Sequence, residues 1–235
     1  MIQYYHKTKR KKGYDMTNAL LNERTIPSNL SPLFHNYQEL LEMQQLYNAA
    51  IKEIETKLDI LNNEFNVRYM RNPIHHIESR LKSPQSILQK LTRRGFEISP
   101  DSAKKNLNDI AGIRVVCCYI DDVYQVADTL LRQSDLRLVN ITDYIKTPNY
   151  NGYRSLHLDL EVPIYLSERT EYVIAEVQLR TVAMDFWASL EHEMHYKSEK
   201  NIPSDIVEQM LKSADEIAAI DQKMQDIYHR IQQIP

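Results

Sequence analysis

The sequence predicts an α/β fold of the α+β kind, in which one mixed sheet of four or five strands is covered by helices and flanked by long terminal helices. Two kinds of periodicity carry this prediction. Residues 155–162 and 171–181 alternate polar and apolar side chains, as a strand with one buried face does. Residues 33–66 and 204–233 place apolar side chains three or four residues apart, which is the spacing of a helix.

The composition is that of a soluble globular chain of 235 residues, with 43% hydrophobic and 26% charged residues. The net charge of -3 argues against a general nucleic-acid binder, which would be basic. No apolar run approaches the roughly 18 residues that span a membrane, and no signal peptide opens the chain. We therefore expect a cytoplasmic protein that makes no contact with a membrane.

Two residue types narrow the chemistry further. Cys117 and Cys118 are adjacent and would point to opposite faces of a strand, so we expect no disulfide between them and a reducing compartment. The sequence contains 4 glycines, and their spacing excludes both G-x-G-x-x-G and the Walker A loop. A phosphate site in this chain would have to use side chains and helix ends.

The first part of the chain is predicted to be helical. Residues 1–15 are basic and are expected to form a disordered tail ahead of a single domain over residues 16–235. Ser31-Pro32 starts the long helix at 33–66, because a cap residue precedes a proline at the first helical position. Asn72-Pro73 ends this helix.

A second start signal, Ser83-Pro84, opens a helix that runs to about Arg94. Basic and hydroxyl side chains recur on one of its sides and continue just upstream. Such a face is either solvated or a phosphate site, because free backbone N–H groups and the helix dipole add to the charge at a helix N-terminus. The sequence leaves both readings open.

The centre of the chain alternates between strands and a helix. Residues 115–120 form an apolar run typical of a strand buried on both faces, and Asp109 lies shortly before this run. Asp121-Asp122 cap a helix to about Gln133, and a strand follows at 136–145. A loop at 146–154 carries the turn signal Asn151-Gly152.

The two strands at 155–162 and 171–181 each present a polar face. Glu176, Gln178 and Arg180 share one side of the second strand, and His157 lies on the polar side of the first. The two strands thus carry a carboxylate, an amide, a guanidinium and an imidazole on one side. This polar surface, called here the polar floor, is a candidate active site. A helix at 182–197 follows, in which His192 and His195 have the spacing of a metal pair but not that of H-E-x-x-H.

Four segments together resemble the synthetase domain of the RelA/SpoT homologues, and in particular the stand-alone small alarmone synthetases of the RelP-type branch. They are Asp109-Ile-Ala-Gly-Ile-Arg114, Asn151-Gly-Tyr-Arg-Ser-Leu-His157, Glu176-Val-Gln-Leu-Arg-Thr181 and Asp185-Phe-Trp-Ala-Ser-Leu-Glu-His192. The resemblance covers about residues 70–233. It implies a nucleotidyltransferase-like sheet and transfer of pyrophosphate from ATP to the 3′-hydroxyl of GDP or GTP, giving ppGpp or pppGpp and AMP.

The resemblance also implies roles for individual residues. Asp109 and Glu176 would be catalytic and would hold Mg²⁺, with Glu176 also able to take the proton of the attacking hydroxyl. The residues implied to bind ATP are Arg80 and Arg114, which sandwich the adenine, and the phosphate contacts Lys82, Ser86, Lys90 and Arg94. The residues implied to bind GDP or GTP are Tyr153, which stacks on guanine, and Arg154, His157, Gln178 and Arg180, which hold phosphates and order the floor.

Two further expectations follow. The H-D metal motif of the multidomain hydrolases is not matched by His75-His76-Ile-Glu78, so no hydrolase activity is expected. The apolar stripes of the helices at 33–66 and 204–233 would be exposed in a monomer, which predicts a subunit interface at these terminal helices, and the resemblance to the small alarmone synthetases implies that the assembly is a homotetramer. Two alternatives stay open: a catalytically silent nucleotide-binding regulator, and an RNA-binding module on the same fold.

Overall fold

The structure is a computed structural model that describes residues 31–197 and 203–234, with side chains for residues 38–194 and 203–234. Residues 1–39 and 40–235 form two separate units, and the sheet and its hydrophobic core belong to the second. The predicted tail at 1–15 and the side chain of His195 lie outside the described residues. Among the described residues, no helix combines the length and the apolarity needed to cross a membrane.

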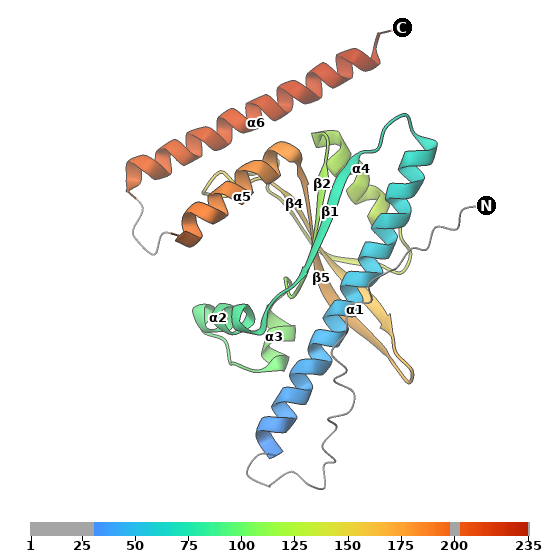
Figure 1. The fold of residues 1–235 in the computed structure, drawn as a ribbon, viewed down its shortest axis with the longest axis vertical. Coiled ribbons are helices and arrows are strands. Elements are labelled where there is room, and N and C mark those ends of the chain that lie inside the picture. Colours follow the sequence, from blue (N-terminus) through green and yellow to red (C-terminus); the bar gives the residue numbers. More distant parts are fainter. Residues whose placement is uncertain (1–30, 198–202, 235) are drawn as a thin grey trace, which may run out of the picture. The chain divides into compact units, whose positions relative to one another are not determined.

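The described residues form a five-stranded mixed sheet and six helices (Figure 1). The strand order is β1-β2-β5-β4-β3, and only the β2–β5 pair is parallel. The strands are β1 Ile74–Leu81, β2 Ala111–Cys117, β3 Arg137–Asp143, β4 Leu156–Tyr165 and β5 Thr170–Thr181. The helices are α1 Ser31–Arg68, α2 Pro84–Arg94, α3 Pro100–Asn106, α4 Ile120–Leu131, α5 Val182–Lys197 and α6 Ser204–Gln232. The prediction of a mixed sheet covered by helices is therefore confirmed.

Two elements, β1 and α3, had no counterpart in the prediction. β1 is an edge strand whose middle residues are half-buried or exposed, so it lacks the alternation by which β4 and β5 are recognised. Helix α3 is short, but Ser99 caps it by accepting from the N–H of Ser102, and Pro100 occupies its first position. This Ser-Pro signal is the same one that opens α2.

The predicted strand at 115–120 extends too far at its C-terminal end. β2 stops at Cys117 because the Asp122 carboxylate accepts the backbone N–H of Tyr119 and starts α4 at Ile120. Val115, Val116 and Cys117 are buried on both faces of the sheet as predicted, whereas Gly112 and Arg114 in the first half of β2 alternate with buried neighbours. Both cysteines are free, as expected.

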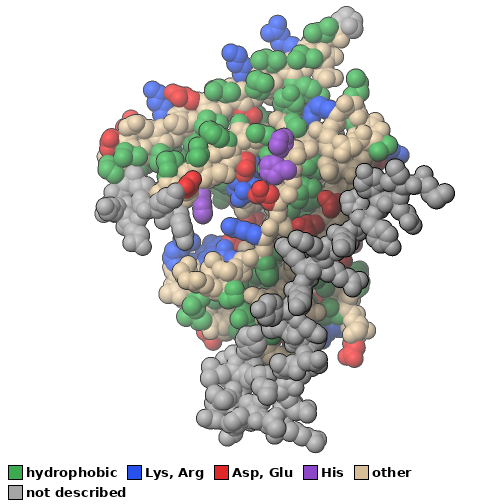
Figure 2. Space-filling view, in the orientation of Figure 1, with side chains coloured by type: hydrophobic (Ala, Val, Ile, Leu, Met, Phe, Trp, Pro, Cys, Tyr) green, Lys and Arg blue, Asp and Glu red, His purple; other side chains and the backbone are tan. Residues whose placement is uncertain are grey.

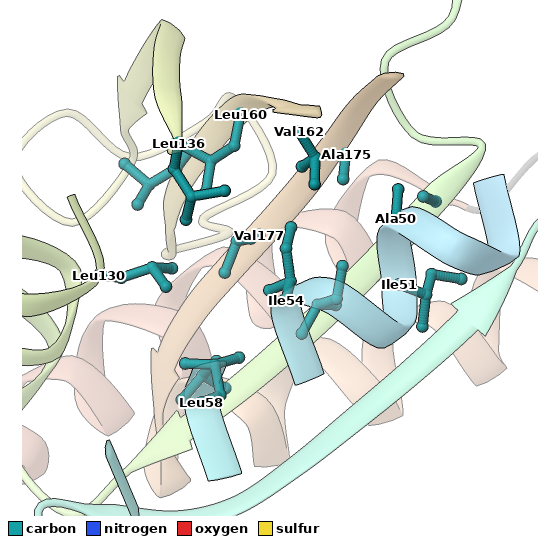
Figure 3. Close-up of a cluster of buried hydrophobic side chains, with 14 of the residues drawn as sticks. Ala50, Ile51, Ile54, Leu58, Leu130, Leu136, Leu160, Val162, Ala175 and Val177 are labelled. Carbon is teal, nitrogen blue, oxygen red and sulfur yellow. The ribbon is translucent and has the colours of Figure 1, made fainter. Parts of the chain in front are cut away.

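Helix α1 covers the apolar face of the sheet. Ile54 and Leu58 are fully buried and point toward Val177 of β5 (Figure 3). The odd-numbered residues of β5 and the even-numbered residues of β4 complete this core with α4. The expectation that the α1 stripe is exposed in a monomer is therefore wrong, because this chain's own sheet buries it. The opposite face of the sheet is left for polar side chains.

Candidate active site

The pairing register collects the polar side chains into two adjacent rows on the face opposite α1. Residues that pair across a sheet point to the same side, so each row joins all five strands. The first row runs through Arg80, Gly112, Glu176, Asp159 and Asn140. The second row runs through Glu78, Arg114, Gln178, His157 and Thr142. Residues expected to contact two different nucleotides thus share one continuous surface.

Asp109 lies just before β2 and is held by two lysines. Its Oδ2 accepts from Lys82 Nζ at 2.8 Å and from Lys90 Nζ at 2.7 Å. Burial favours the neutral acid, but the hydrogen bonds and charges of the two lysines outweigh burial and lower the pKa of Asp109. The other oxygen, Oδ1, is buried and has no hydrogen-bond partner. An unpaired buried carboxylate oxygen is unfavourable unless a cation completes its environment.

Glu176 lies on β5 and is held by its neighbours on the polar face. Gln178 Nε2 donates to Oε2 at 2.6 Å, and His157 Nδ1 lies 3.4 Å from Oε1. Burial opposes the charge of Glu176, but the contacts with His157 and Gln178 outweigh burial and lower its pKa. Asp109 acts in the other direction by charge repulsion, which indicates that the two carboxylates lie near one another.

Asp109 and Glu176 line the same cavity, together with Arg80, Arg114 and Gln178. Two converging carboxylates, one with an unsatisfied oxygen, fit Mg²⁺, which is commonly held by one or two carboxylates with substrate phosphates and water. Among the described residues, no group of three or more His, Cys, Asp or Glu side chains could hold a metal by itself. The residues present therefore fit a metal that arrives with a nucleotide.

A hydrogen-bonded chain links Arg180 to His157 through Tyr153. Arg180 Nη2 donates to the Tyr153 hydroxyl at 2.6 Å, and this hydroxyl lies 2.8 Å from His157 Nε2. The Tyr153 hydroxyl thus contacts both the guanidinium and the imidazole, and the other ring nitrogen of His157, Nδ1, faces Glu176. Burial raises the pKa of Tyr153, so the phenol stays neutral.

A second cavity, of about 620 Å³, opens beside the first between β1, α2 and α5. Figure 2 shows Lys and Arg side chains gathered around a hollow between α2 and α5. Its lining includes Arg80, Lys82, Ser83, Ser86, Lys90 and Arg93. A pocket lined by this many cations fits a polyphosphate.

One residue of the predicted phosphate set, Arg94, lies away from the basic cavity. Arg94 donates to the backbone carbonyl of Asn106 at 3.4 Å and does not line the basic cavity, whereas Arg93 does. Successive helical residues lie about 100° apart, so only one of the two can face the cavity. The i, i+4 spacing from Ser86 to Lys90 continues to Arg94, and this regularity favoured Arg94 over Arg93 in the prediction.

Sequence reasoning also missed Asp185 and the placement of His192. Asp185 Oδ1 accepts from Arg180 Nη1 at 3.1 Å and lies 3.4 Å from Arg114 Nη1, so it joins arginines from the two predicted nucleotide sites. His192 lines the basic cavity from α5. The only sequence signal for Asp185 was its place in the resembling segment.

Arg154 is not brought to the polar floor. Its guanidinium donates to the Gly152 carbonyl at 3.1 Å and to Asp215 Oδ1 on α6 at 3.0 Å. The other residues expected to bind GDP or GTP do converge, since Gln178, Arg180, Tyr153 and His157 form one hydrogen-bonded group. Although Arg154 is next to Tyr153 in the sequence, its side chain does not lie on the polar surface that Tyr153 joins.

Comparisons with known proteins agree with one another. A family profile described as a region found in RelA / SpoT proteins matches residues 79–201. The GTP pyrophosphokinase YwaC of Bacillus subtilis (strain 168) is 45% identical over 179 residues, which are 76% of this chain and 85% of YwaC.

Two crystal structures from Bacillus subtilis are similar in fold. Small alarmone synthetase 2 is 41% identical with a TM-score of 0.74, and the match covers 82% of this chain and 99% of that one. Small alarmone synthetase 1, bound to its product pppGpp, is 30% identical with a TM-score of 0.75 over 80% of this chain and 95% of that one.

Proposed function

The chain belongs to the RelA/SpoT family and resembles its small alarmone synthetases, and on this premise we propose that it is a GTP pyrophosphokinase that makes the alarmones ppGpp and pppGpp. It transfers pyrophosphate from ATP to the 3′-hydroxyl of GDP or GTP and releases AMP. The observation that carries the proposal is the meeting of Asp109 and Glu176 in one cavity, next to a second cavity lined by cations.

The donor nucleotide occupies the basic cavity in this proposal. Lys82, Lys90 and Arg93 neutralise the phosphates of ATP, and Ser86 donates a hydrogen bond. Arg80 and Arg114 lie on neighbouring strands in adjacent rows of the same face, and their planar guanidinium groups stack on the adenine. The lysines that hold Asp109 are the same lysines that meet the phosphates, so donor binding and metal binding are coupled.

The acceptor nucleotide stacks its guanine on Tyr153. His157, Gln178 and Arg180 hold its phosphates and keep the floor in one arrangement through their mutual hydrogen bonds. Glu176 lies at the junction of the two nucleotides. Its carboxylate is ionised at neutral pH, and an ionised carboxylate at this junction can accept the proton of the 3′-hydroxyl.

The chemistry is a displacement at phosphorus. The 3′-oxygen attacks the β-phosphorus of ATP while the bond from that phosphorus to the oxygen shared with the α-phosphate breaks, and AMP leaves with that oxygen. Asp109 and Glu176 would hold Mg²⁺, which would neutralise charge on the phosphates. The remaining contribution of the protein is positioning, supplied by residues fixed on the sheet and on α2.

The test is a nucleotide assay. Purified protein with ATP, GDP or GTP, and Mg²⁺ should produce ppGpp or pppGpp together with equimolar AMP, resolved by anion-exchange chromatography. Asp109→Asn should lose most of the synthesis while its urea unfolding midpoint stays close to that of the wild type. A catalytically silent regulator would bind the nucleotides and make no AMP. An RNA-binding module would retard RNA in a gel and leave both nucleotides unchanged.

Two broader features complete the proposal. The protein assembles as a homotetramer through its C-terminal helix α6, which carries several exposed apolar side chains along its length, whereas the apolar side of α1 is buried in its own chain. It works in the cytoplasm, where ATP and GTP are supplied and where free cysteines such as Cys117 and Cys118 persist.

A further inference from the structure

The loop at residues 149–154, called here the acceptor loop, is attached to α5 and α6 by side chains that do not face the catalytic cavity. Asn151 Nδ2 donates to Glu191 Oε1 of α5 at 3.0 Å. Arg154 donates to Asp215 Oδ1 of α6 at 3.0 Å and to the Ala214 carbonyl at 3.4 Å. The acceptor loop therefore has fixed contacts to both helices.

The backbone of the loop also fits closely against α6. Gly152 has a φ of +84°, and a Cβ added there would lie 2.6 Å from the Cβ of Ala214. No real side chain tolerates that distance, so only glycine permits the loop to approach α6 so closely. Ala214 is buried with Trp187 and Ala188, and Tyr153 packs against this cluster. The ring expected to receive guanine thus lies on a surface that α6 helps to form.

We infer that Arg154 is a positioning residue, which fixes the acceptor loop to α6 so that the docking of α6 sets the affinity for the acceptor nucleotide. The inference rests on the proposed function for the identity of that nucleotide. Arg154 acts through Gly152 and Tyr153 instead of contacting phosphate, since its guanidinium is directed to α6 and its side chain is only 18% exposed. The donor site lies on β1, β2, α2 and α5, and of these elements only α5 contributes to the contacts above, through Glu191 and the cluster around Trp187.

Kinetic constants of three variants test this role. Arg154→Ala should raise KM for GDP about tenfold, because it removes hydrogen bonds from a charged donor, and should change KM for ATP less than twofold. Asp215→Ala should raise KM for GDP by up to about fivefold, the range for an exposed ion pair. Ala214→Leu should also raise it, because the larger side chain displaces Gly152. At saturating GDP, kcat should stay near that of the wild type in all three.

Two control variants on the same helix match these changes. Ala219→Leu adds the same volume at an exposed position, and Asp226→Ala removes a carboxylate whose partner, Gln222, lies on α6 itself. Both should leave KM for GDP unchanged. If Arg154→Ala raises KM for GDP while Asp215→Ala and Ala214→Leu do not, Arg154 binds the nucleotide directly and the inference fails. Equal increases in KM for ATP and GDP would also overturn it.

A second readout needs no activity. Trp187 is the single tryptophan of the chain, is 7% exposed, and lies 3.9 Å from the position of a Cβ on Gly152. Its emission should shift to longer wavelength in Arg154→Ala and Ala214→Leu without nucleotide, but not in Ala219→Leu, with far-UV circular dichroism unchanged. Unchanged emission in Arg154→Ala would overturn the inference. A wild type that makes no alarmone would instead overturn the proposed function and leave this measurement valid.

Discussion

At the scale of single residues, the site depends on charges kept in place by their neighbours. Glu176 stays ionised in a partly closed cavity because His157 and Gln178 stabilise its charge. Asp109 stays ionised for the same reason, through Lys82 and Lys90. Each acid is thus available at neutral pH, one mainly for a cation and the other also for a proton.

Glu176→Gln tests the role of the carboxylate. The amide keeps the shape of the side chain but cannot accept a proton or bind a cation strongly, so kcat for synthesis should fall by about 10²–10⁴-fold. Binding of GDP, measured by calorimetry without ATP, should change much less. A variant that retains most of its kcat would assign the proton transfer to another group.

Tyr153→Ala tests the stacking of guanine. Stacking of a base on an aromatic ring is worth roughly 1–3 kcal/mol, so KM for GDP and GTP should rise by about 5–150-fold while KM for ATP changes little. Tyr153→Phe keeps the ring and removes only the hydroxyl contacts to His157 and Arg180, so it should retain most of the affinity. Equal losses for ATP and GDP in Tyr153→Ala would contradict the assignment.

At the scale of elements, α6 is attached to the sheet and to α4 by polar contacts beneath an otherwise apolar interface. Thr181 Oγ1, at the end of β5, donates to Asp221 Oδ2 at 2.6 Å. The backbone N–H of Asp121, at the start of α4, donates to Gln225 Oε1 at 3.0 Å. These contacts fix the position of α6 along its axis and so fix which residue meets the acceptor loop.

The buried acid in this interface predicts a pH dependence of stability. Burial raises the pKa of Asp221, so the folded protein holds this proton at pH values where the unfolded chain has lost it. Stability is therefore fully present at low pH and declines as the pH rises from the ordinary aspartate pKa through the raised one. Asp221→Asn can still accept from Thr181 but cannot ionise, so this decline should be absent.

Urea unfolding of the two proteins from about pH 4 to about pH 8 provides the measurement. The free energy of unfolding of the wild type, minus that of Asp221→Asn, should decrease with rising pH by on the order of 1 kcal/mol per unit of raised pKa. Taking the difference removes the groups that both proteins share. A difference that does not vary with pH would show that the folded and unfolded proteins ionise Asp221 alike.

At the scale of the whole molecule, α1 and α6 have different surfaces. The apolar side of α1 is buried in the core of its own chain, but α6 keeps exposed Ile220, Met224 and Ile231, at 60%, 48% and 56%. An open groove between α5 and α6 is lined almost wholly by apolar side chains and continues this surface. An exposed apolar surface of this kind is typical of a protein interface.

We therefore expect a tetramer mass for the wild type in light scattering after gel filtration, and a smaller mass for Met224→Glu. A charge at this position is unfavourable inside an apolar interface and harmless on a free surface. Tyr165→Glu is the matched control, since Tyr165 is 75% exposed at the end of β4, away from α6. A monomer mass for the wild type at micromolar concentration would contradict the proposed tetramer. An unchanged mass for Met224→Glu would show that the interface lies elsewhere.

The sequence alone was sufficient for most of the fold, and its resemblance to the family was sufficient to propose Asp109 and Glu176 as the catalytic pair. β4 and β5 were predictable because each strand has one buried face and one polar face. Their sequences therefore alternate between apolar and polar residues with a period of two. Helix α2 was predictable from its cap, since Ser83 and Pro84 act within one turn. Asp109 and Glu176 were identified through the segments that resemble the family, and the register β2–β5 brings these segments side by side.

Only the tertiary structure decided which side chains of those segments meet. β1 owes its existence to pairing with β2, because its own residues lack a buried alternation. The side chains of Arg93 and Arg94 leave α2 in different directions, so that Arg93 lines the basic cavity and Arg94 reaches the Asn106 carbonyl. Arg154 is directed away from Tyr153 because the positive φ of Gly152 allows the loop to lie against α6. Local patterns determine elements, whereas the direction of a side chain depends on contacts with residues distant in the chain.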